Sequence, residues 1–314
     1  MATGGQVAED VLSIRSTTGE AVSVPRFVFN CVSAWLLGND LARGVKGMAG
    51  LGRSYVALPT QLAQTFNFQR KFALCLSSSV KASGVIVFGD YSPYGVMLPP
   101  HKNIDISKSL IYTPLLTNPR GAKYLGQREF SEYYIGVKSI RVNGKAVPLN
   151  TTLLSFEDEG NGGTKISTVN PYTVLESSIY NAVKEAFVRE LPDSVTGVNP
   201  VAPFGACFRG IRSSWTGPQV PSIDFVLPGK NGYWRILGAN SMVEVRKDVE
   251  CLGFVDGGVF GNLIMPAIVI GGHQIEDNLL EFDLPRSRVG FSSSLLLHQT
   301  TCAHFNATTT VSHV

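Results

Sequence analysis

Charge is scarce in this sequence, and long apolar runs are missing. Only 16% of the 314 residues are Asp, Glu, Lys or Arg, against about 25% in an average domain. The longest apolar stretch, residues 263–270, contains Pro266 and is far shorter than the roughly 20 residues that a membrane-spanning helix needs. The formal net charge is only +3, with no contiguous basic stripe of the kind that binds a phosphate backbone. We therefore expect neither a membrane nor a nucleic acid as partner.

Cysteine is also infrequent, and no two cysteines have the C-x-x-C spacing of a zinc site or a thioredoxin-type redox site. The chain has five: Cys31, Cys75, Cys207, Cys251 and Cys302. We expect no metal and no cofactor. Five buried thiols remain open as an interpretation, and so do disulfides that leave one cysteine over, because spacing alone does not decide which cysteines pair.

Two features concern the compartment in which the protein resides. Asn-x-Thr tripeptides at Asn150 and Asn306 are typical of a secreted glycoprotein. The first residues, however, have neither the basic nor the apolar region of a signal peptide, so none is predicted in this chain.

The residues that are abundant predict a turn-rich β-protein. Hydrophobic residues make up 44% of the chain, with 32 glycines and 17 prolines, a balance that excludes disorder. Asn143-Gly144 is a β-hairpin signal. Short runs rich in Val, Ile, Phe and Tyr predict strands at residues 9–15, 24–29, 84–88, 133–142, 233–237 and 253–255.

Helical periodicity is confined to two places, residues 58–66 and 173–191. In the second, apolar residues recur every four positions, Thr173 with Glu176 fits a capping box, and Pro192 ends the pattern. Helices and strands do not alternate regularly, which excludes a doubly wound parallel sheet.

Several segments resemble the pepsin-like aspartic peptidases. Residues 268–292 have an apolar-Gly-Gly turn, a short helix, a strand ending in Phe-Asp, and a Val-Gly-Phe strand, while residues 47–66 have a Gly-Leu-Gly turn followed by a helix. Residues 71–76, 84–90 and 202–208 resemble the non-proteolytic plant branch of that family in particular. This branch comprises basic 7S globulins, extracellular dermal glycoproteins, xyloglucan endoglucanase inhibitors and cereal xylanase inhibitors.

The resemblance covers nearly the whole chain and implies its architecture. We expect an all-β, bilobal pepsin-like fold with a few short helices and an incomplete N-terminal lobe. Residues 1–115 would form the partial N-terminal lobe, residues 130–296 the C-terminal lobe, and residues 297–314 a tail. The family's first catalytic loop and a signal peptide would then belong to a missing N-terminal segment, so an extracellular location is expected.

The same resemblance argues against proteolysis. Aspartic peptidases use two carboxylates, each in an Asp-Thr/Ser-Gly loop, and the chain contains neither Asp-Thr-Gly nor Asp-Ser-Gly. Where the second loop is expected, Ser167 stands at the aspartate's place and Val169 at the glycine's. A serine hydroxyl cannot supply the missing carboxylate, so we expect no peptidase activity.

Disulfide pairing is implied by the family as well. Cys207 would pair with Cys251 inside the C-terminal lobe, and Cys75 with Cys302 would tie the tail to the N-terminal lobe. Cys31 would be left without a partner in this chain.

Members of the branch inhibit microbial cell-wall hydrolases, which implies a glycoside hydrolase as protein partner, an endoglucanase or a xylanase. Two alternatives remain: a storage, stress or ligand-binding protein like the basic 7S globulins, and an aspartic endopeptidase by family assignment alone. For the inhibitor, cationic, aromatic and hydrogen-bonding side chains in exposed loops are the candidates for contact with the hydrolase. They are Arg209, Arg212, Trp215, His298 and Gln299.

Overall fold

A computed structural model describes residues 5–16, 19–32, 45–90, 94–98, 102–119, 131–229, 232–260 and 265–305. Within these ranges the protein is mostly β-structure with four α-helices and short 3-10 turns, as the composition predicts. No described helix combines the length and the apolar character needed to cross a bilayer. The α-helices are α1 (Leu58–Phe66), α3 (Ser177–Arg189), α4 (Gly238–Ser241) and α5 (Gly272–Ile275).

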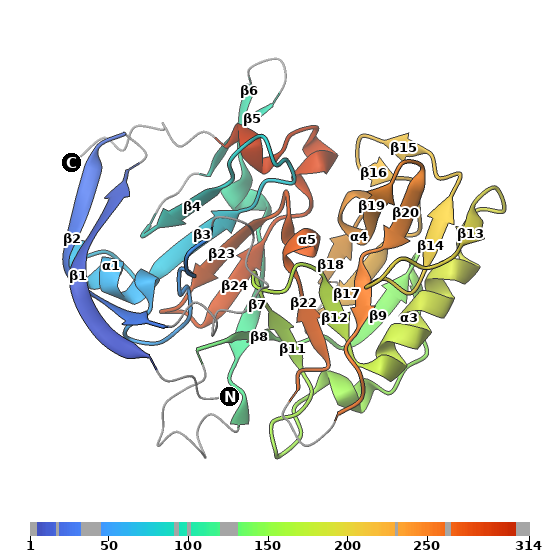
Figure 1. Ribbon diagram of the computed structural model, residues 1–314, viewed down its shortest axis with the longest axis horizontal. Helices are drawn as coiled ribbons and strands as arrows, with labels where there is room; N and C mark the ends of the chain where they lie inside the picture. The colour runs from blue at the N-terminus through green and yellow to red at the C-terminus, as the bar shows by residue number, and fades with distance from the viewer. Residues whose placement is uncertain are drawn as a thin grey trace.

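A ten-stranded mixed sheet runs through the middle of the molecule (Figure 1). Strands from both sequence halves contribute to it, because the last two strands insert between strands from the first half of the chain. Two neighbouring pairs are parallel, and the others are antiparallel. From one edge to the other the order is β21 (Phe254–Asp256), β12 (Thr173–Leu175), β22 (Ile268–Ile270), β11 (Thr164–Ile166), β8 (Tyr133–Ile135), β7 (Ile111–Leu116), β24 (Arg288–Phe291), β23 (Leu279–Asp283), β3 (Lys71–Cys75) and β4 (Val85–Phe88).

Two four-stranded antiparallel sheets and helix α3 lie to one side of the ten-stranded sheet, on the right in Figure 1. The first sheet has the order β10 (Lys145–Ala146), β9 (Ser139–Val142), β17 (Ile223–Val226) and β18 (Tyr233–Ile236). The second has the order β13 (Thr196–Val198), β14 (Cys207–Arg209), β20 (Val249–Leu252) and β19 (Met242–Arg246).

Three hairpins complete the strand inventory of the described residues. The longest stands at the opposite end of the molecule from α3 (Figure 1). The hairpins are β1 (Gln6–Arg15) with β2 (Ala21–Cys31), β5 (Gly95–Leu98) with β6 (Lys102–Asp105), and β15 (Ser213–Ser214) with β16 (Gly217–Pro218). The 3-10 turns are η2 (Ile106–Ser109), η3 (Thr151–Leu154), η4 (Leu295–His298) and η5 (Cys302–His304).

Stacked aromatic side chains join the sheets in one core. Phe282 of β23 lies 4.7 Å from Phe72 of β3 and 4.5 Å from Tyr133 of β8, measured between ring centroids. Trp234 of β18 stacks on Phe291 of β24 at 4.8 Å, so a flanking sheet packs directly on the central one. Such pairs contribute about 0.5–1.5 kcal/mol beyond the area that they bury.

The local predictions are mostly confirmed, with two corrections. Helix α1 has the predicted bounds, and the Asn143-Gly144 turn joins β9 to β10 with a positive φ at both residues. The predicted helix over 173–191 begins only at Ser177, because the three residues before Glu176 pair with strands β21 and β22 as β12. Glu176 itself is the cap, accepting the backbone N–H groups of Ser178 and Ile179, so the capping box headed by Thr173 is wrong.

The predicted strand over residues 133–142 is in fact two strands. The chain leaves the central sheet after β8 and enters a flanking sheet as β9. Gly136 lies at this crossing, where a side chain would contact the ring of Pro228 at 2.7 Å. The glycine allows the close approach, and sequence periodicity gives no warning of the break.

Candidate functional site

An open pocket of about 630 Å³ lies beside β4, which ends the ten-stranded sheet. One wall comes from the β3–β4 connection and from β4 itself, and the other from segments around β12, β19 and α5. Its lining is mainly apolar, with a histidine and a carboxylate on the second wall. The lining residues are Leu76, Ser77, Ala82, Gly84, Val85, Ile86, Pro171, Tyr172, Val243, Gly272, His273 and Glu276.

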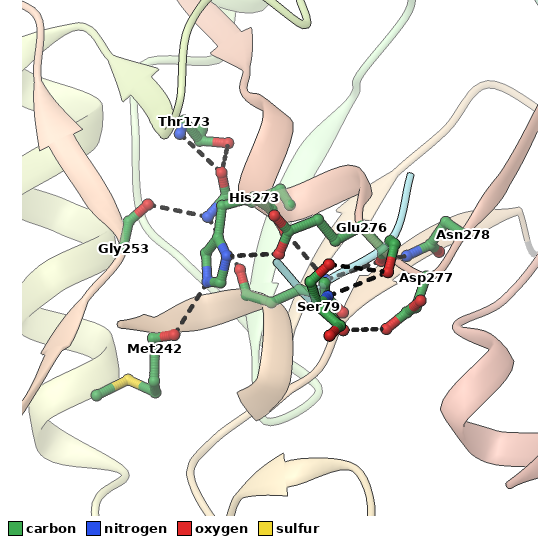
Figure 2. A network of polar contacts seen from close by, with 12 residues as sticks. Ser79, Thr173, Met242, Gly253, His273, Glu276, Asp277 and Asn278 are labelled. Atoms are coloured by element: carbon green, nitrogen blue, oxygen red, sulfur yellow. Dashed lines mark hydrogen bonds and ion pairs between the residues drawn. The ribbon is translucent and has the colours of Figure 1, made fainter. Parts of the chain in front are cut away.

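His273 uses both nitrogens of its ring (Figure 2). Nδ1 lies 3.0 Å from Glu276 Oε2, and Nε2 lies 2.9 Å from the carbonyl oxygen of Met242. The His273 side chain is 17% exposed and that of Glu276 27% exposed. The ring is thus fixed at the pocket wall between the C-terminal end of α5 and the first residue of β19.

Asn240 and Gln274 connect this wall to helix α4. The Asn240 amide donates to the backbone oxygens of His273 at 3.0 Å and Glu276 at 2.9 Å. The fully buried Gln274 donates to the backbone oxygens of Asn240 and Gly253 and accepts from the backbone and hydroxyl of Thr173. All donors and acceptors of the Gln274 amide group are engaged, which is what burial of a polar side chain requires.

Asp277 connects the same segment to the first wall of the pocket. Its backbone N–H donates to Leu76 O at 2.8 Å, and its side chain accepts from the Ser78 hydroxyl at 2.6 Å and from the Cys302 N–H at 2.8 Å. Asp277 is 1% exposed and has φ +50°, a backbone conformation that Asp tolerates better than most residues. One carboxylate therefore holds three distant parts of the chain together (Figure 2).

Ser167 follows β11 at a turn. Its N–H donates to Ile270 O at 2.9 Å, and its hydroxyl oxygen accepts from the backbone N–H groups of Val169 at 3.2 Å and Asn170 at 3.3 Å. The side chain thus closes a local turn. The assignment of this position to the second catalytic aspartate stays a prediction.

Three of the predicted contact residues lie within the seven-residue segment 209–215, which runs from the end of β14 into the β15–β16 hairpin. Arg209 ends β14, Arg212 directly precedes β15, and Trp215 opens the two-residue turn between β15 and β16. All three are exposed, and the Trp215 side chain is 57% exposed. Exposed tryptophan and arginine side chains are of the types enriched at interface centres.

The β15–β16 hairpin packs against helix α4. Ala239 N donates to Thr216 O at 3.0 Å. A Cβ at Gly217 would lie 2.3 Å from the backbone of Ala239, and one at Gly238 would lie 1.8 Å from Pro218 O. Only glycine fits at both contact points, so the hairpin packs closely against α4 at its base.

His298 and Gln299 belong to a different element from that hairpin. They end the 3-10 turn η4, which follows β24, and both are exposed. Gln299 has φ +54° and donates its N–H to Leu296 O at 3.0 Å. They are therefore outside the segment that carries the arginines.

Of the two candidate glycosylation sites, only Asn150 lies within the described residues. Asn150 is exposed at the start of η3, and its side-chain oxygen accepts from the N–H and hydroxyl of Thr152. Asn306 lies outside the described residues.

Both disulfide pairs implied by the resemblance are present. Cys75 is joined to Cys302 and Cys207 to Cys251, the latter pair lying directly opposite each other in β14 and β20. Cys31, at the end of β2, is an exposed thiol.

Sequence reasoning did not find the His273–Glu276 pair as a site. The two residues are three positions apart, a spacing that can bring side chains together on a helix. Helix α5 has only four residues, however, and is too short for hydrophobic periodicity to reveal it in the sequence. The partners Met242 and Leu76 are brought in by tertiary structure alone.

Comparison with known proteins places this geometry in a family. A family model described as "Xylanase inhibitor C-terminal" matches residues 132–293, and one described as "Xylanase inhibitor N-terminal" matches residues 1–90. The chain belongs to this family.

Named relatives of this xylanase inhibitor family member carry several different descriptions. The chain is 55% identical to the "Probable aspartic proteinase GIP2" of Nicotiana benthamiana over 98% of its own length and 70% of that protein's. It is 46% identical to gamma conglutin 1 of Prunus dulcis, covering 96% of this chain and 66% of the relative. It is 40% identical to the basic 7S globulin of Glycine max, covering 95% and 67%. The chain thus spans about two thirds of the length of these relatives.

Solved structures confirm the predicted pepsin-like fold. The crystal structure of edgp superposes with a TM-score of 0.87 at 55% identity, covering 98% of this chain and 74% of that one. The basic 7S globulin from soybean superposes with a TM-score of 0.77 at 39% identity, covering 95% and 71%. The resemblance read from the sequence is therefore confirmed, while the proposed lobe boundaries stay a prediction.

Proposed function

We propose that this xylanase inhibitor family member is an extracellular, non-proteolytic protein that inhibits a microbial glycoside hydrolase acting on plant cell walls. The observation that carries the proposal is the β15–β16 hairpin, which presents an exposed Trp215 in its turn and follows two exposed arginines, Arg209 and Arg212. The description of the matching family model supports the class of partner.

The chemistry of the partner explains why these side chains suit it. Glycoside hydrolases carry two carboxyl groups about 5–10 Å apart in an open cleft. An arginine inserted between them forms charge-assisted, bidentate hydrogen bonds with the ionised carboxylate and excludes the polysaccharide. Trp215 would add apolar area that is already ordered in the free protein, which lowers the entropic cost of binding.

The absence of the catalytic motif supports a non-proteolytic role. Proteolysis needs a carboxylate pair that shares a proton, whereas the sequence has Ser167 at the expected place of one aspartate and no Asp-Thr/Ser-Gly motif. The two disulfides support an extracellular location, because such bonds persist in oxidising compartments.

Titration of enzyme activity tests the proposal. A xyloglucan-specific endoglucanase and a xylanase would each be assayed against increasing amounts of the folded protein, with near-UV circular dichroism on the same sample to verify the fold. We expect a stoichiometric loss of activity for one of the two enzymes. Full activity of both, at protein concentrations well above that of the enzyme, would contradict the inhibitor function and favour the storage or ligand-binding alternative.

A further inference from the structure

We propose that Asn143, at the tip of the β9–β10 hairpin, is a site of spontaneous covalent modification in the folded protein, where water converts its side-chain amide to an acid. The product is an aspartyl or isoaspartyl residue. The conversion would replace an attractive contact between the hairpin and the end of helix α3 with a repulsive one. The proposal does not depend on the glycoside hydrolase.

The reaction uses the residue that follows the asparagine. The backbone nitrogen of Gly144 attacks Cγ of Asn143, so that a nitrogen–carbon bond forms and the Cγ–Nδ2 bond breaks. Nδ2 leaves as ammonia and takes the proton that the Gly144 nitrogen releases. Water then opens the cyclic imide, giving aspartate when it adds at Cγ and isoaspartate when it adds at the backbone carbonyl carbon. Glycine hinders the attack least because it has no Cβ.

The structure leaves the reacting atoms of Asn143 and Gly144 accessible. Both residues are exposed, and the Gly144 N–H has no hydrogen-bond partner among the described residues. A Cβ placed on Gly144 would meet no atom beyond its chain neighbours within 4 Å, so rotation within the turn is unopposed there. The Asn143 N–H donates to Ser222 O at 2.8 Å and its amide to Glu190 Oε2 at 3.3 Å. Neither bond engages the attacking nitrogen, and a brief local opening of the tip allows the attack.

A second Asn-Gly pair, Asn161 with Gly162, is protected by comparison. The Gly162 N–H donates to Met265 O at 2.9 Å, so the attacking nitrogen is engaged. The Asn161 side chain accepts the Met265 N–H at 3.1 Å and donates to Glu157 at 3.4 Å. Gly162 is buried, and a Cβ there would lie 2.2 Å from Ser155 O. The same two residue types are therefore accessible at one site and fixed at the other.

Conversion of Asn143 would change the contact between the hairpin and α3. Glu190 directly follows α3, and its two carboxylate oxygens lie 2.8 and 2.9 Å from Lys145 Nζ. Hydrogen bonds from Lys145 and then from Asn143 lower the pKa of the Glu190 carboxyl. An aspartate at position 143 would remove the second donor and place a like charge beside Glu190. The pKa of Glu190 would therefore rise.

Asn143→Asp shows whether the contact changes in this way. Carbon NMR titration of the Glu190 carboxyl should give a higher pKa in Asn143→Asp than in the wild type. Asn181→Asp adds the same charge at an exposed position within α3 and should leave the Glu190 pKa as it is. An unchanged or lower Glu190 pKa in Asn143→Asp would overturn the predicted effect on this contact.

Peptide mapping by mass spectrometry tests the modification itself. The folded protein is incubated in mildly alkaline buffer and digested in acid, which limits further conversion. We expect the peptide with Asn143 to convert about tenfold or more faster than the peptide with Asn161. In urea, where the structure is lost, the two rates should agree within about threefold. The sequence has a third pair, Asn231-Gly232; Asn231 lies outside the described residues, and its own peptide reports on it separately.

Asn143→Gln assigns the conversion to this side chain. Glutamine keeps the amide but is one carbon longer, so attack by Gly144 would have to form a larger ring, and the peptide should stay unmodified. Conversion of this peptide at the wild-type rate in Asn143→Gln would overturn the proposal. Comparable rates at Asn143 and Asn161 in the folded protein would do so as well, as would a difference that is just as large in urea.

Discussion

The side chain of Gln61 in helix α1 bonds to both backbone polar groups of Val28 in strand β2. Its Oε1 accepts the Val28 N–H at 2.8 Å, and its Nε2 donates to Val28 O at 2.9 Å and to Val56 O at 2.7 Å. The Gln61 amide thus satisfies the two backbone groups of Val28 that a neighbouring β-strand would otherwise bond. It links the two-stranded β1–β2 hairpin, which would be marginal by itself, to the rest of the protein.

Replacing Gln61 should therefore weaken the attachment of this hairpin. Gln61→Ala leaves the Val28 groups without their partner, and we expect a loss of about 1–2 kcal/mol in the free energy of unfolding. Urea denaturation measures it, and limited proteolysis should show earlier cleavage within β2. Gln64→Ala, an exposed glutamine on the same helix, is the control and should be nearly neutral. Equal behaviour of the two variants would contradict the role assigned to Gln61.

The hairpin that carries Trp215 gives a prediction for the inhibitor function. Trp215→Ala, Arg209→Ala and Arg212→Ala each remove a side chain of the type that dominates protein interfaces. We expect at least one arginine variant and Trp215→Ala to weaken inhibition by about tenfold or more, measured as the inhibition constant against the responsive hydrolase.

Arg141→Ala serves as the control, since Arg141 is an exposed arginine of strand β9 in a different sheet. Its potency should equal that of the wild type. Unchanged potency in both arginine variants and in Trp215→Ala would exclude this hairpin as the contact surface, even if inhibition itself is observed.

We expect the folded protein to lose stability in acid because of Asp283. Burial acts to raise the pKa of its carboxyl, but hydrogen bonds from Arg288 and Arg286 outweigh this, and the pKa is lowered overall. A lowered pKa in the folded state stabilises the protein above the unfolded value of about 3.9. This contribution is lost as the pH falls through the lower, folded-state value.

Comparison of the wild type with Asp283→Asn in urea unfolding at several pH values tests this dependence. The wild type should be more stable at pH 6, and the difference should shrink below about pH 4. Asp193→Asn, at an exposed position, should show no such trend. A difference that stays constant down to pH 2 would contradict the assignment.

We expect Asn150 to carry a glycan when the protein is made in a eukaryotic secretory pathway. Its exposed position at the start of η3 leaves it accessible to modification. Thr152→Ala destroys the tripeptide, whereas Thr151→Ala preserves it. We expect intact-mass spectrometry to show loss of one glycan in the first variant only. Identical masses, apart from the substitutions, would show that Asn150 is not modified.

Sequence patterns predicted the class of fold well because strands and turns are local features. The helix at residues 58–66 and the Asn143-Gly144 hairpin needed only periodicity and turn chemistry. The start of α3 was misplaced because Thr173 is recruited into a sheet by strands about 80–95 positions away, and tertiary pairing overrides the helical pattern. The resemblance to a family supplied what local patterns lacked, above all the disulfide pairs.

The pocket could not be predicted from the sequence, for a different reason. His273 and Glu276 are ordinary residues in sequence, and their geometry is created by Met242 and Leu76, which belong to other strands or connections. The exposure of Trp215, by contrast, could be expected because an aromatic residue just before Gly217-Pro218 in a short polar loop has little core to enter; its contact with a hydrolase stays a prediction.

The Cys75–Cys302 bridge, whose cysteines are 227 positions apart, makes most of the polypeptide a closed covalent ring. In a chain-entropy model, a closed loop of this size restricts the unfolded state by about 5 kcal/mol. A single cut by a protease between the two cysteines would open this ring. The two fragments would stay joined through the Cys75–Cys302 disulfide. Without reduction no fragment would be released, and the nicked molecule would keep both sides of the pocket on one covalent body.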